Sequence, residues 1–492
     1  MVKFLFVKKE EIMLDYRFKN QPYAHQAAYL SRFWEKDVAA LFADMGTGKS
    51  FMLINNMCML YDNGRINGAL IVAPKGVYRN WAELELPKHI PDHVMWKCAL
   101  WSPNPNKAQE AALGSLFEPD DVLHILVMNV EAFSTPKGVK FAEKFLLCHS
   151  PLMAVDESTT IKSSSAQRTK SIYKLGRFAK YRRILTGSPV TKSPLDLYTQ
   201  CAFLSPDLLG FSSFFAFQAR YAVLVKRTMG PRSFNQVVGY RRLDELNEKL
   251  QPFAFRVTKE ECIDLPPKVY TKREVPLTDE QAELYNQMKK MALAMLDDGQ
   301  MTTTATALTQ LLRLHQICCG HLKTDDGEVR EIKNNRLDAL LECVEETSGK
   351  VIIWASYTHD ILAIERALSK AYGGGCAATY YGATEGEERQ KIVTRFQDPD
   401  SDLRFFIGQP KTGGYGLTLT AADTVIYYSN NYDLEVRLQS EDRAHRIGQT
   451  KSVTYIDLLT PKSVDEKIVN ALKNKIDIAT QVLGEELKQW LI

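Results

Sequence analysis

The sequence contains no long apolar run. Near its start, only Phe4 to Val7 are uninterruptedly apolar before Lys and Glu follow, which is far shorter than the core of a signal peptide. No other apolar segment approaches the roughly 18 residues that a membrane-spanning helix needs. We therefore expect a soluble, intracellular protein that has no membrane partner.

Cysteine pairs are also missing. The nine cysteines are scattered and odd in number, and none forms a Cys-x-x-Cys motif, which is typical of reduced thiols in a cytosol. The segment HQICCGH, residues 315–321, brings two histidines and two cysteines together. Adjacent cysteines diverge by about 100° on a helix, and no second ligand pair lies nearby. We therefore favour a buried helix end capped near Gly320 over a zinc site.

A strong charge of one sign is absent as well. The chain has 62 basic and 59 acidic residues and a formal net charge of +3, so its overall charge does not by itself indicate a nucleic-acid partner. No tandem repeat or low-complexity tract stands out. The remaining composition, with 45% hydrophobic and 25% charged residues, is that of an ordinary soluble protein.

Length and pattern predict two α/β sheets. At 492 residues the chain is too long for one comfortable core, so we expect two or three domains. From residue 38 onward, short β-rich apolar runs alternate with helical patterns, as in parallel sheets wound by helices. The predicted strands form a first series at 38–43, 69–73, 123–129, 152–156 and 183–187, and a second series at 351–356, 376–381, 404–408, 424–429 and 452–459.

Between the two series of strands, the sequence pattern changes to one that is mainly helical. Residues 195–340 carry helical patterns such as LDELNEKLQPFAF and DEQAELYNQMKKMALAML. Within this region, Pro266 and Pro267 can continue neither a helix nor a central strand. We therefore expect the chain to pass from one lobe to the other at this double proline.

A phosphate-binding loop is predicted after the first strand, in the segment ADMGTGKS. Gly46 and Gly48 allow backbone N–H groups to curl around a phosphate, and the following helix adds its dipole. Lys49 can reach the terminal phosphates, and Ser50 can hold Mg²⁺. Ala43 replaces the first glycine of the general P-loop pattern, but the Gly-x-Gly-Lys-Ser core is intact. A plain glycine-rich turn would need neither the lysine nor the serine, so we favour a phosphate site.

A pair of carboxylates is expected beside this loop. The apolar strand at 152–156 ends in Asp156 and is followed by Glu157, at the edge where a doubly wound sheet places its ligands. Asp156 suits the Mg²⁺ shell, and Glu157 suits a base for the attacking water. Alone, a strand-terminal Asp-Glu pair is common, but behind a P-loop it is the expected partner of a metal-bound triphosphate.

An arginine pair lies in the second series, in the segment QSEDRAHRIGQ. If this segment is helical, Arg443 and Arg446 share one helix face. An arginine from outside the P-loop lobe can stabilise the charge of phosphoryl transfer, typically by about 10³-fold or more. We expect these arginines to complete the ATP site only when the lobes close, which would couple hydrolysis to movement. Ordinary solvated charge beside Glu441 and Asp442 is the alternative.

Together these segments resemble the seven-motif series of the Swi/Snf-type ATPases, a branch of helicase superfamily two. The resemblance covers about residues 16–485. The segments RAHRIGQ and PFAFRVTKEECIDLPPK are highly specific to that branch, whereas GKS and DE are shared with many NTPases. The ordered set is PYAHQAAYL, GTGKS, IVAPKGVYRNW, DEST followed by IKSSSAQRTK, LTGSP, YYGATEGEERQKIVTRFQ, TGGYGLTLTAADTVI and QSEDRAHRIGQ.

The resemblance implies a DNA-dependent ATPase with two RecA-like lobes that carry helical protrusions. It also implies ATP and Mg²⁺ as cofactors, and hydrolysis coupled to tracking along double-stranded DNA, usually without separation of the strands. The expected boundaries are an N-terminal lobe at 1–265 with an insertion at about 195–260, and a C-terminal lobe at 266–492 with a helical insertion at about 278–340.

By matching position, the resemblance also implies residue roles. Most of these residues would contact the nucleotide, its metal or the attacking water, and the others would link the nucleotide state to DNA. The implied assignments are Gln26 for adenine; Gly46, Thr47, Gly48, Lys49 and Ser50 for phosphates and Mg²⁺; Asp156 for the metal and Glu157 for water; Gln439, Arg443 and Arg446 for the γ-phosphate; Thr186 and Ser188 for DNA grip; and Gly413, Gly414 and Gly416 for communication between the nucleotide and DNA sites.

Two positions depart from the family pattern. Thr159 stands where the family often has the histidine of Asp-Glu-x-His, which leaves coupling through that contact open but does not affect the expected hydrolysis. The loop SNNYDLEVRLQ before the last motif lacks the tryptophan and proline that are frequent there.

Two basic segments are candidates for DNA-backbone contact. Residues 168–183 contain seven Lys or Arg, and residues 208–243 contain six around a TMGPRS centre that looks like a hairpin tip, with no acid in either segment. Phosphate binding needs such local density rather than a high net charge, and the family uses its protrusion in this way. A solvated helix and a disordered loop are the respective alternatives. No basic-plus-aromatic pattern suggests base reading, so we expect weak sequence preference.

The resulting hypothesis is an ATP-driven translocase on double-stranded DNA that remodels DNA structures or displaces bound proteins. A strand-separating or strand-annealing helicase on DNA or RNA is one alternative, and a catalytically silent DNA-binding scaffold is another. The intact Lys49, Asp156, Glu157 and arginine pair argue against the scaffold. Because 492 residues leave little room beyond the motor, we favour a bacterial or viral setting and a cytoplasmic location, or a nuclear one in a eukaryote. We also expect a monomer.

Overall fold

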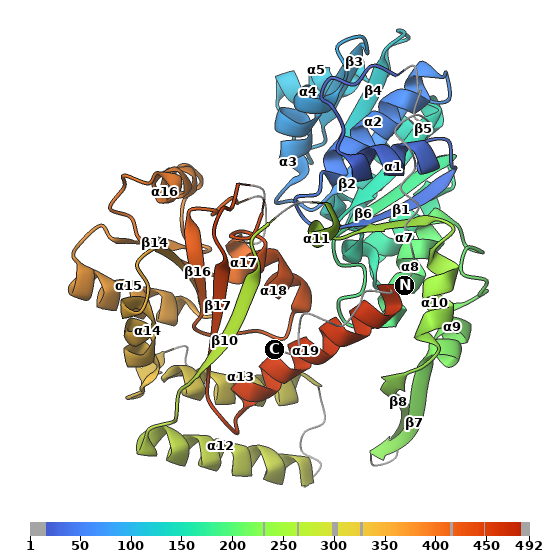
Figure 1. The fold of residues 1–492 in the computed structure, drawn as a ribbon. Helices are drawn as coiled ribbons and strands as arrows, with labels where there is room; N and C mark the ends of the chain where they lie inside the picture. The colour runs from blue at the N-terminus through green and yellow to red at the C-terminus, as the bar shows by residue number, and fades with distance from the viewer. Residues whose placement is uncertain are drawn as a thin grey trace. The chain divides into compact units, whose positions relative to one another are not determined.

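The computed structural model contains two compact α/β units (Figure 1). The main part of unit 1 is residues 16–226 and 235–262, and that of unit 2 is residues 265–476. Each unit holds one large parallel sheet, which confirms the predicted fold class. The residues that the structure describes are 16–229, 232–262, 265–297, 304–324, 328–413, 417–446 and 448–483. Among them, no helix combines the length and the apolar character that crossing a bilayer requires.

The sheet of unit 1 has seven strands, and all neighbouring strands run parallel. Its order is β3-β4-β2-β5-β6-β1-β9, so β1, which precedes the P-loop, lies between β6 and β9. The carboxyl ends of β1, β6 and β5 therefore meet at one edge, where open α/β sheets bind ligands. The bounds are Val38–Ala43 (β1), Gly68–Ala73 (β2), Trp96–Leu100 (β3), Leu123–Asn129 (β4), Pro151–Asp156 (β5), Tyr181–Thr186 (β6) and Ala254–Val257 (β9).

Helices cover both faces of this sheet. α1 and α2 pack on one face, whereas α6, α7 and α8 pack on the other. Short π-helical and 3₁₀ turns join several of these elements. The helices are α1 (Ala24–Phe33), α2 (Lys49–Asp62), α3 (Tyr78–Asn80), α4 (Leu86–His89), α5 (Lys107–Ser115), α6 (Pro136–Cys148), α7 (Gln167–Gly176), α8 (Leu197–Leu204), α9 (Phe214–Tyr221), α10 (Leu243–Leu250) and α11 (Lys259–Cys262).

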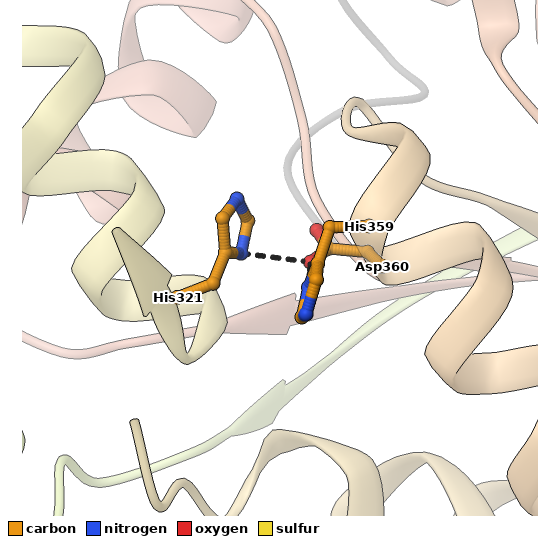
Figure 2. A group of neighbouring side chains, drawn as sticks. All are labelled: His321, His359 and Asp360. Atoms are coloured by element: carbon orange, nitrogen blue, oxygen red, sulfur yellow. Dashed lines mark ion pairs between the residues drawn. The ribbon is translucent and has the colours of Figure 1, made fainter. Parts of the chain in front are cut away.

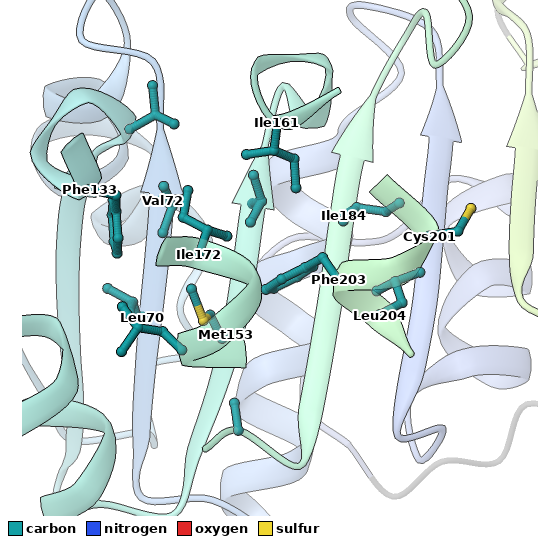
Figure 3. Close-up of a cluster of buried hydrophobic side chains, with 14 of the residues drawn as sticks. Leu70, Val72, Phe133, Met153, Ile161, Ile172, Ile184, Cys201, Phe203 and Leu204 are labelled. Atoms are coloured by element: carbon teal, nitrogen blue, oxygen red, sulfur yellow. The ribbon is translucent and has the colours of Figure 1, made fainter. Parts of the chain in front are cut away.

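The central strands of unit 1 are buried on both faces. In β2, Leu70 and Val72 belong to one hydrophobic cluster, whereas Ala69 and Ile71 belong to the other. Successive side chains of a strand point to opposite faces, so each residue of β2 meets a covering layer of helices. Figure 3 shows the first cluster, in which Ile172 of α7 packs over the sheet. This double burial explains why the central strands are continuous apolar runs in the sequence.

A separate two-stranded sheet occupies the second basic segment. It consists of β7 (Ala222–Met229) and β8 (Arg232–Tyr240). The predicted hairpin is therefore present in place of the alternative, a disordered loop. Gly230 and Pro231, at the predicted tip, lie outside the described residues.

The sheet of unit 2 has six strands, which are again all parallel. In β13, Val351 and Ile353 belong to one hydrophobic cluster, and Ile352 and Trp354 belong to the other. The strand order is β10 (Lys268–Glu274), β17 (Val453–Leu459), β16 (Ala422–Tyr427), β13 (Lys350–Trp354), β15 (Phe405–Gly408) and β14 (Ala377–Tyr380).

A helical segment precedes β13 in unit 2. Its helices α12 and α13 pack against each other, and a short antiparallel pair, β11 and β12, follows α13 (Figure 1). The bounds in this unit are α12 (Asp279–Asp297), α13 (Thr304–Cys319), β11 (His321–Lys323), β12 (Val329–Glu331), α14 (Arg336–Glu345), α15 (Thr358–Tyr372), α16 (Gly386–Gln397), α17 (Pro410–Gly413) and α18 (Leu434–Glu441), and the last helix of the chain is α19 (Val464–Leu483).

The ten predicted strands are all present, with ends shifted by at most two residues. Five further strands of the described residues were not predicted: β3, β9 and β10, each at an edge of a large sheet, and β11 and β12, which form a separate two-stranded sheet. The expected helical pattern LDELNEKLQPFAF was wrong in its second half. α10 ends at Leu250, because Pro252 cannot continue a helix, and the chain enters β9 at Ala254. The insertion expected at about 195–260 therefore ends before β9, which belongs to the main sheet.

The segment 315–321 forms the expected helix end, and its last residue, His321, belongs to a group of possible metal ligands. α13 ends at Cys319, and Gly320 follows with φ of 88°, the left-handed conformation typical of the residue after a helix. His315 Nδ1 pairs with the Tyr357 hydroxyl at 2.7 Å. Burial raises the pKa of Cys318 to about 11, which keeps it a thiol. The group of possible metal ligands found among the described residues contains none of these cysteines.

Candidate nucleotide site

The P-loop joins β1 to α2 in unit 1 and has the backbone that its glycines were expected to permit. Gly46 and Gly48 have φ of 84° and 87°, which side-chain-bearing residues rarely adopt. A Cβ on Gly48 would lie only 2.2 Å from Gln26 Nε2. The loop is closed by Thr47, whose N–H and hydroxyl both donate to the Asp44 carbonyl, at 3.3 and 2.8 Å. Both positions therefore need glycine because of their backbone conformation, and position 48 also needs it because a Cβ would not fit there.

Lys49 begins α2 and points back across the loop. Its Nζ donates to the carbonyl oxygens of Ala43 at 2.8 Å and Asp44 at 3.3 Å. These acceptors are neutral, and hydrogen bonds between an ammonium and a phosphate oxygen are stronger. The ammonium can therefore exchange these carbonyls for phosphate oxygens. Ser50 follows in the same first turn of α2.

Gln26 of α1 is tied to the P-loop backbone. Its Oε1 accepts from Tyr23 N–H at 3.0 Å, and its Nε2 donates to Thr47 O at 3.2 Å. His25, which was not predicted, also pairs with Thr47 O through Nε2, at 2.8 Å. Burial lowers the pKa of His25, so its ring is neutral at neutral pH and Nε2 carries the donated proton. Two adjacent residues of α1 thus hold one carbonyl of the loop.

Asp156 ends β5 and is partly buried. Its Oδ2 accepts from the indole Nε1–H of Trp81 at 2.9 Å, and its Oδ1 accepts from the Glu157 N–H at 3.0 Å. Burial raises the pKa of Asp156, opposed by the Trp81 bond and by the charge of Lys49. A carboxylate that burial disfavours is stabilised by a cation, so Asp156 fits the role of a Mg²⁺ ligand. Trp81 was not predicted as part of the site.

Glu157 and Thr186 are brought into contact at the ends of β5 and β6. Thr186 Oγ1 donates to Glu157 Oε2 at 3.1 Å and accepts from the Ser188 N–H at 3.2 Å. Glu157 has a left-handed backbone, with φ of 46°, a conformation that costs a residue with a side chain about 1–3 kcal/mol and concentrates at functional sites. The LTGSP motif therefore contacts the proposed base directly.

Arg256 of β9 holds the start of the P-loop and was missed in the sequence. Its Nη1 donates to Asp44 Oδ1 at 3.0 Å and to the carbonyls of Phe42 and Gly187 at 3.2 and 3.3 Å. The Lys259 N–H donates to the other Asp44 oxygen at 3.2 Å. The edge strand β9 therefore fixes the loop after β1 to the loop after β6. The run PFAFR carries no local signal of this contact, because its partners are about 70 and 210 residues away.

In unit 2, Gln439 lies on α18, but the segment that holds Arg443 and Arg446 is not helical, so the condition for a shared helix face is not met. α18 ends at Glu441, and both arginines follow it in turns. They converge nevertheless, because both guanidiniums donate to the carbonyl of Leu417, at 3.3 and 2.9 Å.

The alternative of ordinary solvated charge does not fit this region. Arg443 is only 2% exposed. Glu441 is also buried, and its carboxylate pairs with Arg437 at 2.8 Å and with Lys268 at 3.2 Å. These charges are therefore part of the interior of unit 2.

The remaining residues of this set are only partly described. Gln439 is buried, and its Nε2 donates to Glu435 Oε1 at 3.3 Å. Gly413 ends α17. Gly414 and Gly416 lie outside the described residues.

The basic segment 168–183 separates into exposed and buried cations. Arg183 is fully buried, donating to Asn56 Oδ1 at 2.8 Å and to several backbone carbonyls, including that of Lys36 at 2.7 Å. Its inclusion in a DNA-contacting patch was therefore wrong, because its N–H groups stabilise the fold. The cations exposed on or just after α7 are Lys170, Lys174, Arg177 and Lys180.

Two parallel-sheet units, one with a P-loop and a strand-terminal Asp-Glu pair, define a helicase-like ATPase core. Residues 24–322 match the SNF2-related domain, and residues 333–448 match the helicase conserved C-terminal domain. The chain therefore belongs to the SNF2-related family. The resemblance inferred from the ordered motifs is confirmed.

Curated proteins similar to the chain come from bacteria and eukaryotes. YwqA of Bacillus subtilis, described provisionally as an ATP-dependent helicase/translocase, is 28% identical over 92% of this chain and 47% of its own length. The SWI/SNF chromatin-remodeling complex subunit snf22 of Schizosaccharomyces pombe is 27% identical over 92% of this chain and 27% of its own. The Sulfolobus solfataricus SWI2/SNF2 ATPase core in complex with dsDNA is 24% identical, covers 95% of each chain and has a TM-score of 0.41. The chain thus spans less than half the length of these curated relatives.

Proposed function

We propose that the protein hydrolyses ATP with Mg²⁺ and uses this reaction to move along double-stranded DNA. The observation that carries the proposal is the constellation at one edge of the unit 1 sheet. There, Lys49 crosses the P-loop after β1, while Asp156 ends β5, which is separated from β1 by β6, and Glu157 directly follows Asp156. In a member of the SNF2-related family, this constellation supports phosphoryl transfer to water.

In the proposed reaction, the N–H groups of the P-loop hold the phosphates, and Lys49 binds the terminal oxygens in place of two carbonyls. Ser50 and Asp156 would hold Mg²⁺, which would neutralise charge on the phosphate oxygens. Glu157 orients the attacking water and takes its proton. The hydrogen bond from Thr186 fixes one oxygen of Glu157 and thereby orients the carboxylate.

We further propose that Gln439, Arg443 and Arg446 act on the terminal phosphate from unit 2. The two guanidiniums share the Leu417 carbonyl, which concentrates positive charge at one point. An anionic oxygen is a stronger partner for a guanidinium than a neutral carbonyl. Gly413, Gly414 and Gly416 are proposed to connect this region to the DNA site.

Double-stranded DNA is proposed as the track. The four exposed cations of α7 and the turn after it, together with the exposed Lys226 and Arg227 on β7, suit phosphate-backbone contact with little sequence preference. The description of YwqA as a helicase/translocase also supports movement on nucleic acid.

The first experiment compares ATP hydrolysis with double-stranded, single-stranded and forked DNA, with RNA and without nucleic acid. We expect strong stimulation by duplex DNA. Lys49→Ala should abolish turnover, and Glu157→Gln should lower it by about 10²–10⁴-fold, the range of a general base. Lys107→Ala, which removes an exposed lysine on α5, is the matched control and should retain activity. Equal turnover with and without nucleic acid would overturn the proposal.

A second experiment distinguishes translocation from strand separation. Displacement of the third strand of a triplex, without separation of the duplex, supports translocation. Separation of a forked duplex without triplex displacement would instead identify a strand-separating helicase. DNA binding without phosphate release would identify a scaffold.

A further inference from the structure

A group of possible metal ligands lies in unit 2, apart from the residues proposed for the nucleotide. His321 is the first residue of β11, and His359 and Asp360 lie in the first turn of α15. One ligand atom from each residue lies within 4.8 Å of the others (Figure 2). No second group of this kind was found in the described part of the chain.

The separations of these atoms suit a single metal ion. His321 Nδ1 lies 3.0 Å from Asp360 Oδ1, and His359 Nδ1 lies 3.6 Å from the same oxygen. Zinc binds nitrogen and oxygen at about 2.0–2.1 Å in a tetrahedron, so its ligands lie about 3.3 Å from one another. The two observed distances fall on either side of this value. The third pair of ligand atoms, from His321 and His359, lies within 4.8 Å, so the two imidazoles would move closer together to share one ion.

The polar atoms of the group lack other partners. His321 and Asp360 are each only 2% exposed. Among the described residues, His321 Nδ1, His359 Nδ1 and Asp360 Oδ2 have no hydrogen-bond partner, although the first two are close enough to Asp360 for an ion pair. Buried polar atoms nearly always have a partner. The two imidazole nitrogens face one oxygen of Asp360, whereas the other oxygen, Oδ2, has no partner among the described residues, so an ion bound between the three side chains would complete the site.

Glu331 lies next to the group of three ligands and contacts His359. It lies directly opposite His321 in the antiparallel pair of β11 and β12, so both side chains project from the same face. Its Oε1 lies 3.3 Å from Nε2 of His359. A metal-bound imidazole commonly donates its other ring N–H to a carboxylate. His359 has this arrangement, with Nδ1 toward Asp360 and Nε2 toward Glu331.

We propose that His321, His359 and Asp360 bind a divalent transition-metal ion of the Zn²⁺ class, and that Glu331 orients His359. Two imidazoles and one carboxylate suit zinc and its neighbours in the transition series, whereas Mg²⁺ and Ca²⁺ prefer oxygen ligands. The three protein ligands leave a fourth position for water. This ion is separate from the Mg²⁺ proposed for the nucleotide.

The ion would join the end of the helical segment to the main fold of unit 2. His321 directly follows α13 and Gly320, whereas α15 packs on the sheet next to β14 and β15. A metal bound only by the folded protein stabilises it by mass action. We therefore expect a structural role, with higher thermal stability when the metal is bound.

The test uses the full chain, treated with a chelator and then titrated with Zn²⁺ against a chromogenic competitor. We expect the chain to bind one equivalent of Zn²⁺ and to melt at a higher temperature when this ion is bound. When Co²⁺ replaces Zn²⁺, we expect intense visible absorption. His359→Gln changes the more accessible ligand, with a side chain 23% exposed. Glu331→Ala changes a residue outside the ligand shell and should weaken Zn²⁺ binding by about 10–100-fold. His359→Gln removes a ligand and should weaken Zn²⁺ binding more than Glu331→Ala does.

His93→Gln is the matched control. The ring of His93 also pairs with a carboxylate, Asp62, at 2.9 Å, but it belongs to no metal-ligand group found among the described residues. This variant should bind Zn²⁺ as the unaltered chain does. DNA-stimulated ATP hydrolysis at constant Mg²⁺ reports whether each variant is folded. Zn²⁺ affinity that is equal in the unaltered chain and folded His359→Gln would overturn the proposal, as would the absence of a stoichiometric Zn²⁺ site in the folded chain.

Discussion

Replacing Trp81 with phenylalanine tests the proposed electrostatics of Asp156. The indole Nε1–H of Trp81 donates to Asp156 Oδ2 at 2.9 Å, and Trp81 is buried. Burial already raises the pKa of Asp156, and the indole bond opposes that shift. Phenylalanine keeps most of the buried ring but removes the donor. The pKa of Asp156 should therefore rise further.

The expected size follows from the strength of the lost bond. A hydrogen bond to a charged group contributes about 1.5–3 kcal/mol, so the ionised form of Asp156 should lose about this much stabilisation and its pKa should rise. In the proposed reaction Asp156 must be ionised to hold Mg²⁺, so activity should fall as pH drops through this pKa. The acid limb of the pH–rate profile should accordingly move to higher pH at sub-saturating Mg²⁺.

The same change has a defined effect on stability. A carboxyl group whose folded pKa lies above its unfolded value binds more protons when folded, so folding stability falls as pH rises between the two pKa values. The additional loss in Trp81→Phe should be about 1.5–3 kcal/mol at neutral pH. It should be much smaller below the unfolded pKa, where the carboxyl group is protonated in both states.

The assay is the pH dependence of kcat/KM for DNA-stimulated hydrolysis, together with thermal unfolding at acidic and neutral pH. Trp354→Phe is the matched control, because Trp354 is fully buried and its Nε1 has no hydrogen-bond partner among the described residues. It should lose stability through packing but keep the acid limb in place. If folded Trp81→Phe shows the same acid limb as the unaltered chain, the assignment of that limb to Asp156 is wrong.

Two further substitutions test the geometry of the loop and of the proposed base. Gly48→Ala would place a Cβ 2.2 Å from Gln26 Nε2, at a backbone φ of 87°. The left-handed backbone alone costs a residue with a side chain about 1–2 kcal/mol. The variant should therefore bind nucleotide more weakly, as measured by calorimetry. Gly64→Ala, with φ of 63° and no atom within 4 Å of the new Cβ, is its control and should lose stability but not affinity. Thr186→Val removes the donor to Glu157 and should lower kcat by about tenfold or more with nucleotide affinity unchanged; an unaltered single-turnover rate would contradict this role.

The fold was predictable where strands are buried on both faces. β2 and β13 are continuous apolar runs in the sequence, and their burial explains that pattern. The strands that escaped prediction lie at sheet edges, where one side lacks a neighbouring strand. β10 reads KVYTKRE and has no buried residue, so its sequence resembles a polar loop. Its position is set by pairing with β17, which local sequence does not encode.

The site was predictable where its chemistry is contiguous in sequence. The P-loop glycines and Lys49 occupy one short segment, and the strand-loop-helix context specifies their conformation. Trp81 and Arg256 were not predicted because they reach the site from 75 and 212 residues away. The arginine pair shows a third case. Its convergence was expected from helical spacing, but it arises from turns that aim both side chains at the Leu417 carbonyl.

Hydrogen-bond partners distinguish cations that stabilise the fold from cations that can bind a ligand. Arg183 directs its guanidinium at Asn56 and at backbone carbonyls, so turning toward DNA would leave buried carbonyls without donors, which is costly. Among the described residues, Lys49 donates to two carbonyls at the start of the P-loop, and phosphate oxygens can replace them with stronger bonds. The seven cations of residues 168–183 thus contain at most four exposed ones on or after α7. Because the salt dependence of DNA affinity scales with the number of phosphates neutralised, this segment contributes less to it than its charge suggests.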